Sequence, residues 1–113
     1  MTLEELEIIV DNFKSTLTFP APYGCCLERS YAFWEHLIGL GHTRHSIQFG
    51  TFDNKPHCWN ELDDVDGVEF VVDLSVDMFG ISFPQIIICP QDKTFRTYPY
   101  RYENNEDKSE GES

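Results

Sequence analysis

The spacing of apolar residues changes near residue 41, and this change constrains the fold more than any other feature of the sequence. Residues 2–14 and 26–40 repeat apolar side chains every three or four positions, which predicts two amphipathic helices. After residue 44 the apolar segments are short or alternate with polar residues, which predicts strands. Helices followed by strands favour an α+β fold, in which the helix over 26–40 packs on a small antiparallel sheet and the first helix lies beside it.

Each predicted helix has one apolar stripe that we expect to be buried. The first stripe consists of Leu3, Leu6, Ile9, Val10 and Phe13. The second consists of Leu27, Tyr31, Trp34 and Ile38, and it is widened by Phe33 and Leu37.

Local signals set the expected boundaries of the elements. Thr2 and Glu5 fit a capping box at the start of the first helix, and Gly41 is a suitable C-terminal cap for the second. Pro20 and Pro22 exclude a helix in the loop between the two. The expected strands span 44–52, 57–62, 68–74 and 85–89, with a last edge strand over 95–102 that Pro99 interrupts.

The length of 113 residues fits one domain, and 41% hydrophobic residues are enough for a core. We assign residues 1–102 to this domain. Residues 103–113 carry five acidic residues, one lysine and no apolar residue, so we expect a disordered acidic tail. The N-terminal segment has acids where a secretion signal needs bases, and no apolar run approaches the roughly 20 residues that span a bilayer. These features predict a soluble, unprocessed, cytoplasmic protein.

The charge balance argues against two classes of partner. Twenty Asp and Glu residues oppose eight Lys and Arg residues, which gives a net charge of −12, and the eight bases are scattered along the chain. Such a chain is repelled by nucleic acids and by anionic membranes. We therefore expect neither as a partner.

The four cysteines are candidates for reactive or metal-binding thiols, because no secretion signal supports a disulfide framework. Cys25, Cys26, His57 and Cys58 supply four possible metal ligands. Adjacent residues on a strand, such as His57 and Cys58, point to opposite faces and do not easily share an ion. Zinc sites also usually space paired ligands by two to four residues. We therefore predict no metal and no cofactor, and the metal content of the purified protein tests this alternative.

Cys26, His57 and Asp73 form the arrangement best suited to chemistry. Cys26 opens a predicted helix, where free amides and the helix dipole favour a thiolate and can hold an oxyanion. His57 begins a predicted strand, and imidazole is the usual base for a thiol nucleophile. A hairpin that pairs Leu62 with Val68 also pairs His57 with Asp73 and places both side chains on one face. The carboxylate then fixes the tautomer of the imidazole.

Each of these three residues also has a purely structural alternative. A cysteine at a helix start is often a small buried filler, and a histidine beside an aromatic residue is often a satisfied core residue. An aspartate close to a serine often belongs to a turn or a cap. The order of the three, each on a suitable element, favours the catalytic interpretation.

Three stretches follow one another between residues 22 and 75: GCCLERSYAFWEHLIGLG, HCWNEL and VVDLS. In this order they resemble the transglutaminase-like superfamily of cysteine enzymes, within the wider papain-like group. That family has Gly-x-Cys opening a helix, a small residue one turn later and Leu-Gly at the helix end. Here these are Gly24 and Cys26, then Ser30, then Leu40-Gly41. Its His-small-Trp-x-Glu strand is matched by residues 57–61, and its apolar strand ending in Asp by residues 71–73.

By this resemblance Cys26 is the nucleophile, His57 the base and Asp73 the orienting acid. The family attacks amide carbonyls through a thioester, and passes the acyl group to water, as in peptidases and deamidases, or to an amine, as in transglutaminases. The short form is similar to the leader peptidases of lasso-peptide biosynthesis. The resemblance implies a protein or peptide substrate, and the short chain leaves room for a partner protein to complete the cleft.

The sequence departs from the family before the nucleophile, because the papain-type glutamine is absent. The second oxyanion donor is therefore either another backbone amide or the Tyr23 hydroxyl. Gly24, Cys25 and Trp59 are expected to line the site together with Tyr23, and Trp59 to shield the Cys–His pair. We choose Cys26 over Cys25 as the nucleophile because only Cys26 fits the Gly-x-Cys pattern and the helix spacing.

A binding function on the same fold is the alternative to catalysis. Fold alone does not imply activity, and an acidic surface can occupy a basic partner by mimicking an anion. The alternative is therefore a catalytically inactive acidic binding or inhibitor module. Retention of the biological effect in Cys26→Ala would favour it over an enzyme.

Overall fold

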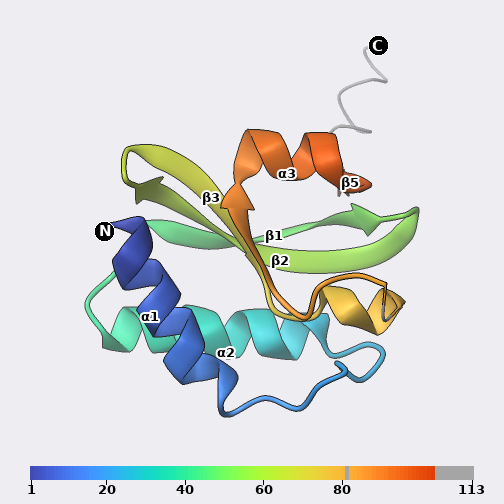
Figure 1. The fold of residues 1–113 in the computed structure, drawn as a ribbon, viewed down its shortest axis with the longest axis horizontal. Helices are drawn as coiled ribbons and strands as arrows, with labels where there is room; N and C mark the ends of the chain where they lie inside the picture. The colour runs from blue at the N-terminus through green and yellow to red at the C-terminus, as the bar shows by residue number, and fades with distance from the viewer. Residues whose placement is uncertain (81, 104–113) are drawn as a thin grey trace.

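The computed structural model describes residues 1–80 and 82–103, in which three helices and one 3₁₀ turn accompany a five-stranded antiparallel sheet (Figure 1). The predicted α+β fold is confirmed. In chain order the elements are α1 (Leu3–Lys14), α2 (Cys26–Gly39), β1 (His45–Phe52), β2 (Lys55–Val65), β3 (Val68–Asp73), the 3₁₀ turn η1 (Val76–Phe79), β4 (Ile87–Pro90), α3 (Gln91–Thr97) and β5 (Tyr100–Tyr102). Residues 104–113 of the predicted tail lie outside the described residues. None of the described helices is long and apolar enough to cross a membrane.

The strands are ordered β4-β3-β2-β1-β5, and both faces of the sheet are covered. Figure 1 shows α1 and α2 under one face and α3 over the other. The first core joins α1, α2, β2 and β3, and its buried residues include Leu6, Val10, Phe33, Leu37, Leu62 and Val72. The second core lies on the opposite face and consists of Phe52, Trp59, Val71, Val76, Ile87 and Tyr100. Because side chains alternate along a strand, successive residues of β2 and β3 serve different cores.

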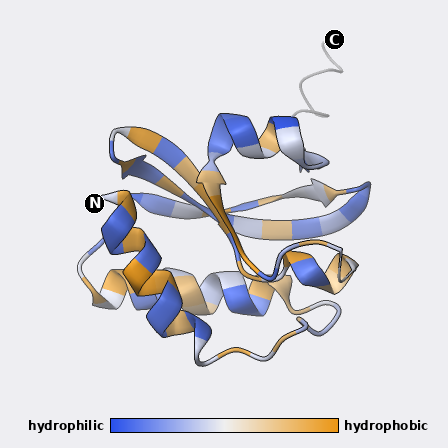
Figure 2. Cartoon of the chain, viewed as in Figure 1, coloured by the Kyte–Doolittle hydropathy of each residue, from blue (hydrophilic) through white to orange (hydrophobic). Residues whose placement is uncertain are grey.

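The ends of the first two helices follow the local signals in the sequence. The capping box of α1 is confirmed, because the Glu5 amide donates to Thr2 Oγ1 and the Thr2 amide donates to the Glu5 carboxylate. The end of α2 is also as predicted, since Gly41 takes a left-handed φ of +91° and the His42 amide donates to the Leu37 carbonyl. Hydrophobic and hydrophilic residues alternate along α1 as an amphipathic helix requires (Figure 2).

The apolar stripe predicted for α2 is only partly buried, so this expectation was wrong in detail. Leu27 and Tyr31 are 52% and 50% exposed. The helix instead buries Arg29, Ser30, Phe33 and Leu37. Polar groups near its start are acceptable against the sheet because they are hydrogen-bonded, as when the Ser30 carbonyl accepts from Asn60 Nδ2 at 3.0 Å.

The C-terminal third also differs from expectation. Residues 95–97, predicted as part of an edge strand, belong to α3, and only Tyr100–Tyr102 form the edge strand β5. Pro90 precedes α3, and the buried Thr94 hydroxyl donates to the Pro90 carbonyl at 2.8 Å. Proline before the first turn and this hydrogen bond favour the helix over the strand that the aromatic content suggested.

Candidate active site

The start of α2 is held in place by a loop that two buried hydrogen bonds fasten to the rest of the fold. The Arg29 guanidinium donates to the Leu74 carbonyl at 2.8 Å and also to the Thr18 carbonyl. The Ala21 amide donates to the buried carboxylate of Asp77 at 2.9 Å. These contacts tie residues 15–25 to the end of β3 and to η1, and so fix where α2 begins.

The turn before α2 exposes the first thiol of the helix. Gly24 has a φ of +84°, a left-handed conformation that suits glycine. Cys25 is the N-cap residue, so Cys26 is the first residue of the helix. The Cys25 side chain makes no capping hydrogen bond. Cys26 is therefore next to free amide groups at the positive end of the helix dipole.

His57 and Asp73 form a buried pair. His57 Nε2 lies 2.7 Å from Asp73 Oδ2, and neither side chain has any accessible surface. Two further groups hold the carboxylate. The Ser75 amide donates to Oδ1 at 3.0 Å, and the Tyr100 hydroxyl donates to Oδ2. The sequence prediction that His57 and Asp73 share a face is thus matched by the structure.

The register that brings the two residues together differs from the one we expected. Asn60 pairs with Val72 and Leu62 with Phe70, and a bulge lies between Leu62 and Val65. The pairing of Leu62 with Val68, and with it the direct pairing of His57 with Asp73, was therefore wrong by two residues. A shift of two residues keeps every side chain on the same face, so the side chains meet diagonally instead of directly opposite each other.

Cys26 and His57 lie at the same pocket. With Nε2 bonded to Asp73, Nδ1 is buried and makes no hydrogen bond among the described residues. The charge of Cys26 contributes to the pKa of His57, and both residues line one pocket of about 390 Å³. The other walls of that pocket include Cys58, Leu27, Phe49 and Pro56, with Glu103 among the lining residues.

The electrostatics of the site favour a thiolate beside an imidazolium. The neighbouring Cys58 thiol has the largest influence on the pKa of Cys26; together with the nearby His57 it outweighs burial and lowers this pKa to about 4. The pKa of the Cys58 thiol is raised, most of all by Cys26 and next by burial. Of these two thiols, Cys26 is therefore the one that ionises. Burial alone would lower the pKa of His57, but the hydrogen bond with Asp73 and the charges of Asp73 and Cys26 raise it to about 9. At a pH between these two values, both pKa shifts favour the thiolate–imidazolium form of the pair.

An aromatic shell encloses the imidazole. The ring centroid of His57 lies 4.9 Å from that of Phe79, and 6.0 Å from those of Phe52 and Trp59. The structure therefore places Trp59 beside the histidine, as expected. Its indole nitrogen donates to the buried carboxylate of Glu61 at 2.9 Å. Such a shell keeps water from the His57–Asp73 hydrogen bond and strengthens it.

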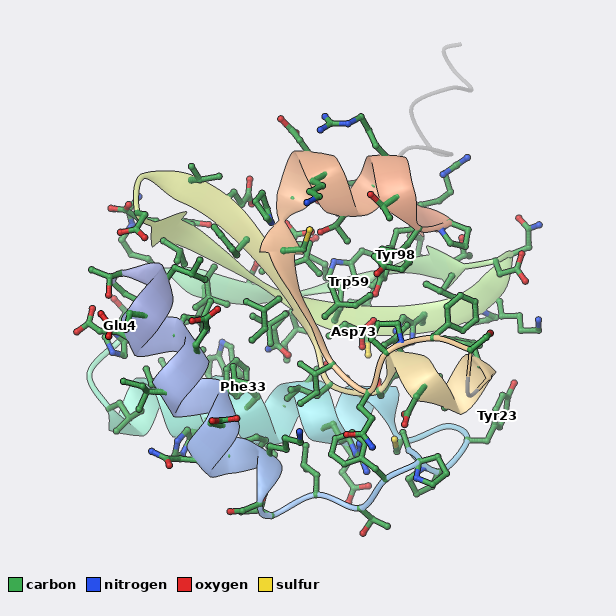
Figure 3. All side chains as sticks on the ribbon, viewed as in Figure 1. Glu4, Tyr23, Phe33, Trp59, Asp73 and Tyr98 are labelled. Atoms are coloured by element: carbon green, nitrogen blue, oxygen red, sulfur yellow. The ribbon has the colours of Figure 1, made fainter. Side chains whose placement is uncertain are left out.

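The remaining predicted site residues lie farther away. Tyr23 is 80% exposed, and in Figure 3 it lies apart from Asp73 at the edge of the molecule, so the structure does not bring its hydroxyl into the pocket. Cys25 lines a different hollow, with Phe13 and Leu17, and burial raises the pKa of its thiol. The two adjacent thiols thus line different hollows, and of the two only Cys26 shares a hollow with His57.

Sequence reasoning missed three residues of this site: Cys58, Ser75 and Tyr100. Cys58 could have been found, because it follows His57 on a strand and so points toward the helix that bears Cys26. Ser75 stands two residues after Asp73, the spacing of a local side-chain hydrogen bond to the backbone. No local signal marked Tyr100, which is 27 residues from Asp73.

Among residues 1–80 and 82–103, no three His, Cys, Asp or Glu side chains come together in a way that could hold a metal ion. Comparisons with known protein families, with curated proteins and with solved structures found no match to this chain.

Proposed function

We propose that this protein is a thiol enzyme that cleaves or transfers the acyl group of an amide through Cys26, His57 and Asp73. The observation that carries the proposal is the buried hydrogen bond between His57 Nε2 and Asp73, with the other ring nitrogen free of hydrogen bonds among the described residues and the histidine in one pocket with Cys26 at the start of α2. This is the arrangement in which one imidazole can serve a nucleophile and keep its orientation. The same residues carry the resemblance to the transglutaminase-like and papain-like enzymes.

The acylation step follows from the charges in the site. The Cys26 thiolate attacks the carbonyl carbon of the amide, and amides in the first turn of α2 are placed to stabilise the oxyanion. His57 Nδ1 gives its proton to the departing amine, the C–N bond breaks, and a Cys26 thioester remains. Asp73 holds the ring throughout.

The deacylation step reverses the role of the histidine. His57, now neutral, removes a proton from the acyl acceptor, which attacks the thioester. Water as acceptor gives a carboxylic acid, and an amine gives a new amide. In both cases the Cys26 thiolate and the His57 imidazolium are restored. The half-exposed apolar walls of the pocket, Leu27 and Phe49, fit an apolar part of a protein or peptide substrate.

The proposal is tested by the alkylation rate of each cysteine with iodoacetamide between pH 5 and 9, with the modified residue located by mass spectrometry. An isolated thiol has a pKa of about 8.5 and reacts slowly at pH 6. We expect Cys26 to react fast at pH 6 and to slow in His57→Ala. Cys25 is the internal control, because it is adjacent in sequence but faces a different hollow.

Two results would contradict an enzyme. One is slow reaction of all thiols up to pH 8, and the other is reaction of Cys26 only after unfolding. Either result would favour the acidic binding module, which predicts that Cys26→Ala keeps the biological effect.

A further inference from the structure

The Asp73 carboxylate receives more hydrogen bonds than an orienting carboxylate needs to hold one imidazole. Its Oδ1 accepts from the Ser75 amide at 3.0 Å and from the Ser75 hydroxyl at 3.4 Å. Its Oδ2 accepts from both His57 Nε2 and the Tyr100 hydroxyl. Tyr100 is completely buried, and its hydroxyl comes from β5, at the other side of the sheet from β3 in the strand order. A side chain from a distant strand therefore bonds to the same carboxylate oxygen as His57.

Among residues 1–80 and 82–103, Tyr100 is the neutral donor that shares this oxygen with His57. Asp73 from β3 and Cys26 from α2 act on His57 directly, and Cys58 of β2 acts on Cys26. The turn η1 places Phe79 against the His57 ring. Asp77, the acidic residue of this turn, accepts a hydrogen bond from the Ala21 amide in the loop before α2. Burial and the adjacent carboxylate raise the pKa of Tyr100, so its hydroxyl keeps its proton.

We infer that Tyr100 is a positioning residue of the site, whose hydroxyl holds Asp73 Oδ2 against His57 Nε2 and limits the negative charge that this oxygen offers to the imidazolium. The inference rests on the proposed function, because it assigns Tyr100 a role in setting the state of the Cys26–His57 pair. A hydrogen bond to a carboxylate spreads its charge, so an oxygen with two donors attracts each of them less than it would attract one alone.

The chain contains a matched control two residues away. Tyr102 lies on the same strand, and its hydroxyl also donates to a buried carboxylate, that of Glu61. Glu61 bonds Trp59 and not His57. Tyr100→Phe and Tyr102→Phe therefore make the same chemical change on one strand, and only the first touches the oxygen that holds His57. The aromatic contacts of Tyr100 with Phe52 and Trp59, both at 4.9 Å between centroids, do not need the hydroxyl.

The experiment measures the pKa of His57 in the full chain by NMR, from the pH dependence of its ring Cε1–H signal. We expect Tyr100→Phe to raise this pKa by about one unit, because Oδ2 becomes a better acceptor for His57 alone. Tyr102→Phe should leave it unchanged. A second variant keeps the ring and strengthens the donor: replacing Tyr100 by 3-fluorotyrosine, whose hydroxyl is more acidic, should lower the pKa of His57.

The alkylation rate of Cys26 at pH 6, measured on the same samples, separates the two proposals. Fast alkylation in the unmodified protein, with opposite shifts for the two changes at Tyr100, supports both. If alkylation is fast but neither change moves the pKa of His57, or both move it in the same direction, the positioning role is wrong and the proposed function stands. If the unmodified protein alkylates slowly, the proposed function is wrong and Tyr100 positions no catalytic pair.

Discussion

Replacing Gly50 by alanine tests how closely β5 packs on β1 and how firmly β5 holds Tyr100. Gly50 pairs with His57 on one side and with Tyr102 on the other. A Cβ at position 50 would lie 1.9 Å from the Arg101 carbonyl oxygen and 2.9 Å from the Trp59 ring. Non-bonded heavy atoms at their best separation are about 3.5–4.0 Å apart. The carbonyl belongs to the backbone and cannot rotate away, so β5 itself must move.

The expected loss of stability follows from that displacement. Overpacking in a filled region destabilises by about 1–3 kcal/mol. Moving β5 also weakens its pairing with Gly50, Thr51 and Phe52, and each backbone hydrogen bond contributes about 1 kcal/mol. We therefore expect Gly50→Ala to lower the free energy of unfolding by about 3–5 kcal/mol.

Urea unfolding followed by tryptophan fluorescence measures this change. The control is Gly39→Ala, because Gly39 lies at the end of α2 and nothing is within 4 Å of the Cβ it would gain. Alanine in a helix is more favourable than glycine by up to about 1 kcal/mol, so the control should keep or raise the stability. A loss of less than about 1 kcal/mol in Gly50→Ala, with an unchanged urea dependence, would refute the close packing of β5.

Two further predictions concern the charges of the site. His57, whose pKa is raised to about 9 in the folded state, contributes stability that is complete below its unfolded pKa of about 6.5 and is lost as the pH rises through 9. Cys26, whose pKa is lowered to about 4, contributes stability that is complete above its unfolded pKa of about 8.5 and is lost as the pH falls through 4. Cys26→Ser removes the thiol but keeps Asp73, so the unfolding free energy of the unmodified protein relative to this variant should rise as the pH increases from 4 and level off only where His57 of the variant loses its proton. A constant difference from pH 4 to 8.5 in urea titrations would contradict an ionic pair. Asp73→Asn should lower the pKa of His57 and thereby raise that of Cys26, so the midpoint of the pH profile of Cys26 alkylation should move from about pH 4 to higher pH, by about one pH unit for each tenfold change in the thiol's acidity; an unchanged midpoint would show that the carboxylate does not control the pair.

Short-range signals account for the parts of the fold that were predicted well. The capping box of Thr2 and Glu5 is closed within four residues, and the left-handed turn at Gly41 needs only a residue without a side chain. The helix over 26–40 and the strands β1 to β3 were placed within a few residues for the same reason, because their periods are visible in the chain. These patterns do not predict how α2 is rotated about its axis. That rotation depends on the buried hydrogen bonds of Arg29 and of the Ser30 carbonyl, which a pattern of apolar residues does not indicate.

Local preference failed where tertiary contacts opposed it. Residues 95–97 include an aromatic and a β-branched residue that favour a strand, yet they complete a helix that begins after Pro90. Thr94 is buried there, and Phe95 packs on the second core. Packing and the backbone bond of Thr94 outweigh a preference that spans about 1 kcal/mol.

The sequence by itself determined the chemistry available to this protein: a thiol at a helix start, an imidazole and a carboxylate on two neighbouring strands, and their common face. The prediction that His57 and Asp73 share a face holds although the predicted register was wrong by two residues, because side chains alternate along a strand with a period of two. Only the tertiary structure decided which groups complete the site. Tyr100 reaches Asp73 across 27 residues of chain, and Cys58 meets Cys26 because α2 packs on β2. Such contacts depend on how whole elements dock, and a pattern that repeats over a few residues does not encode that docking.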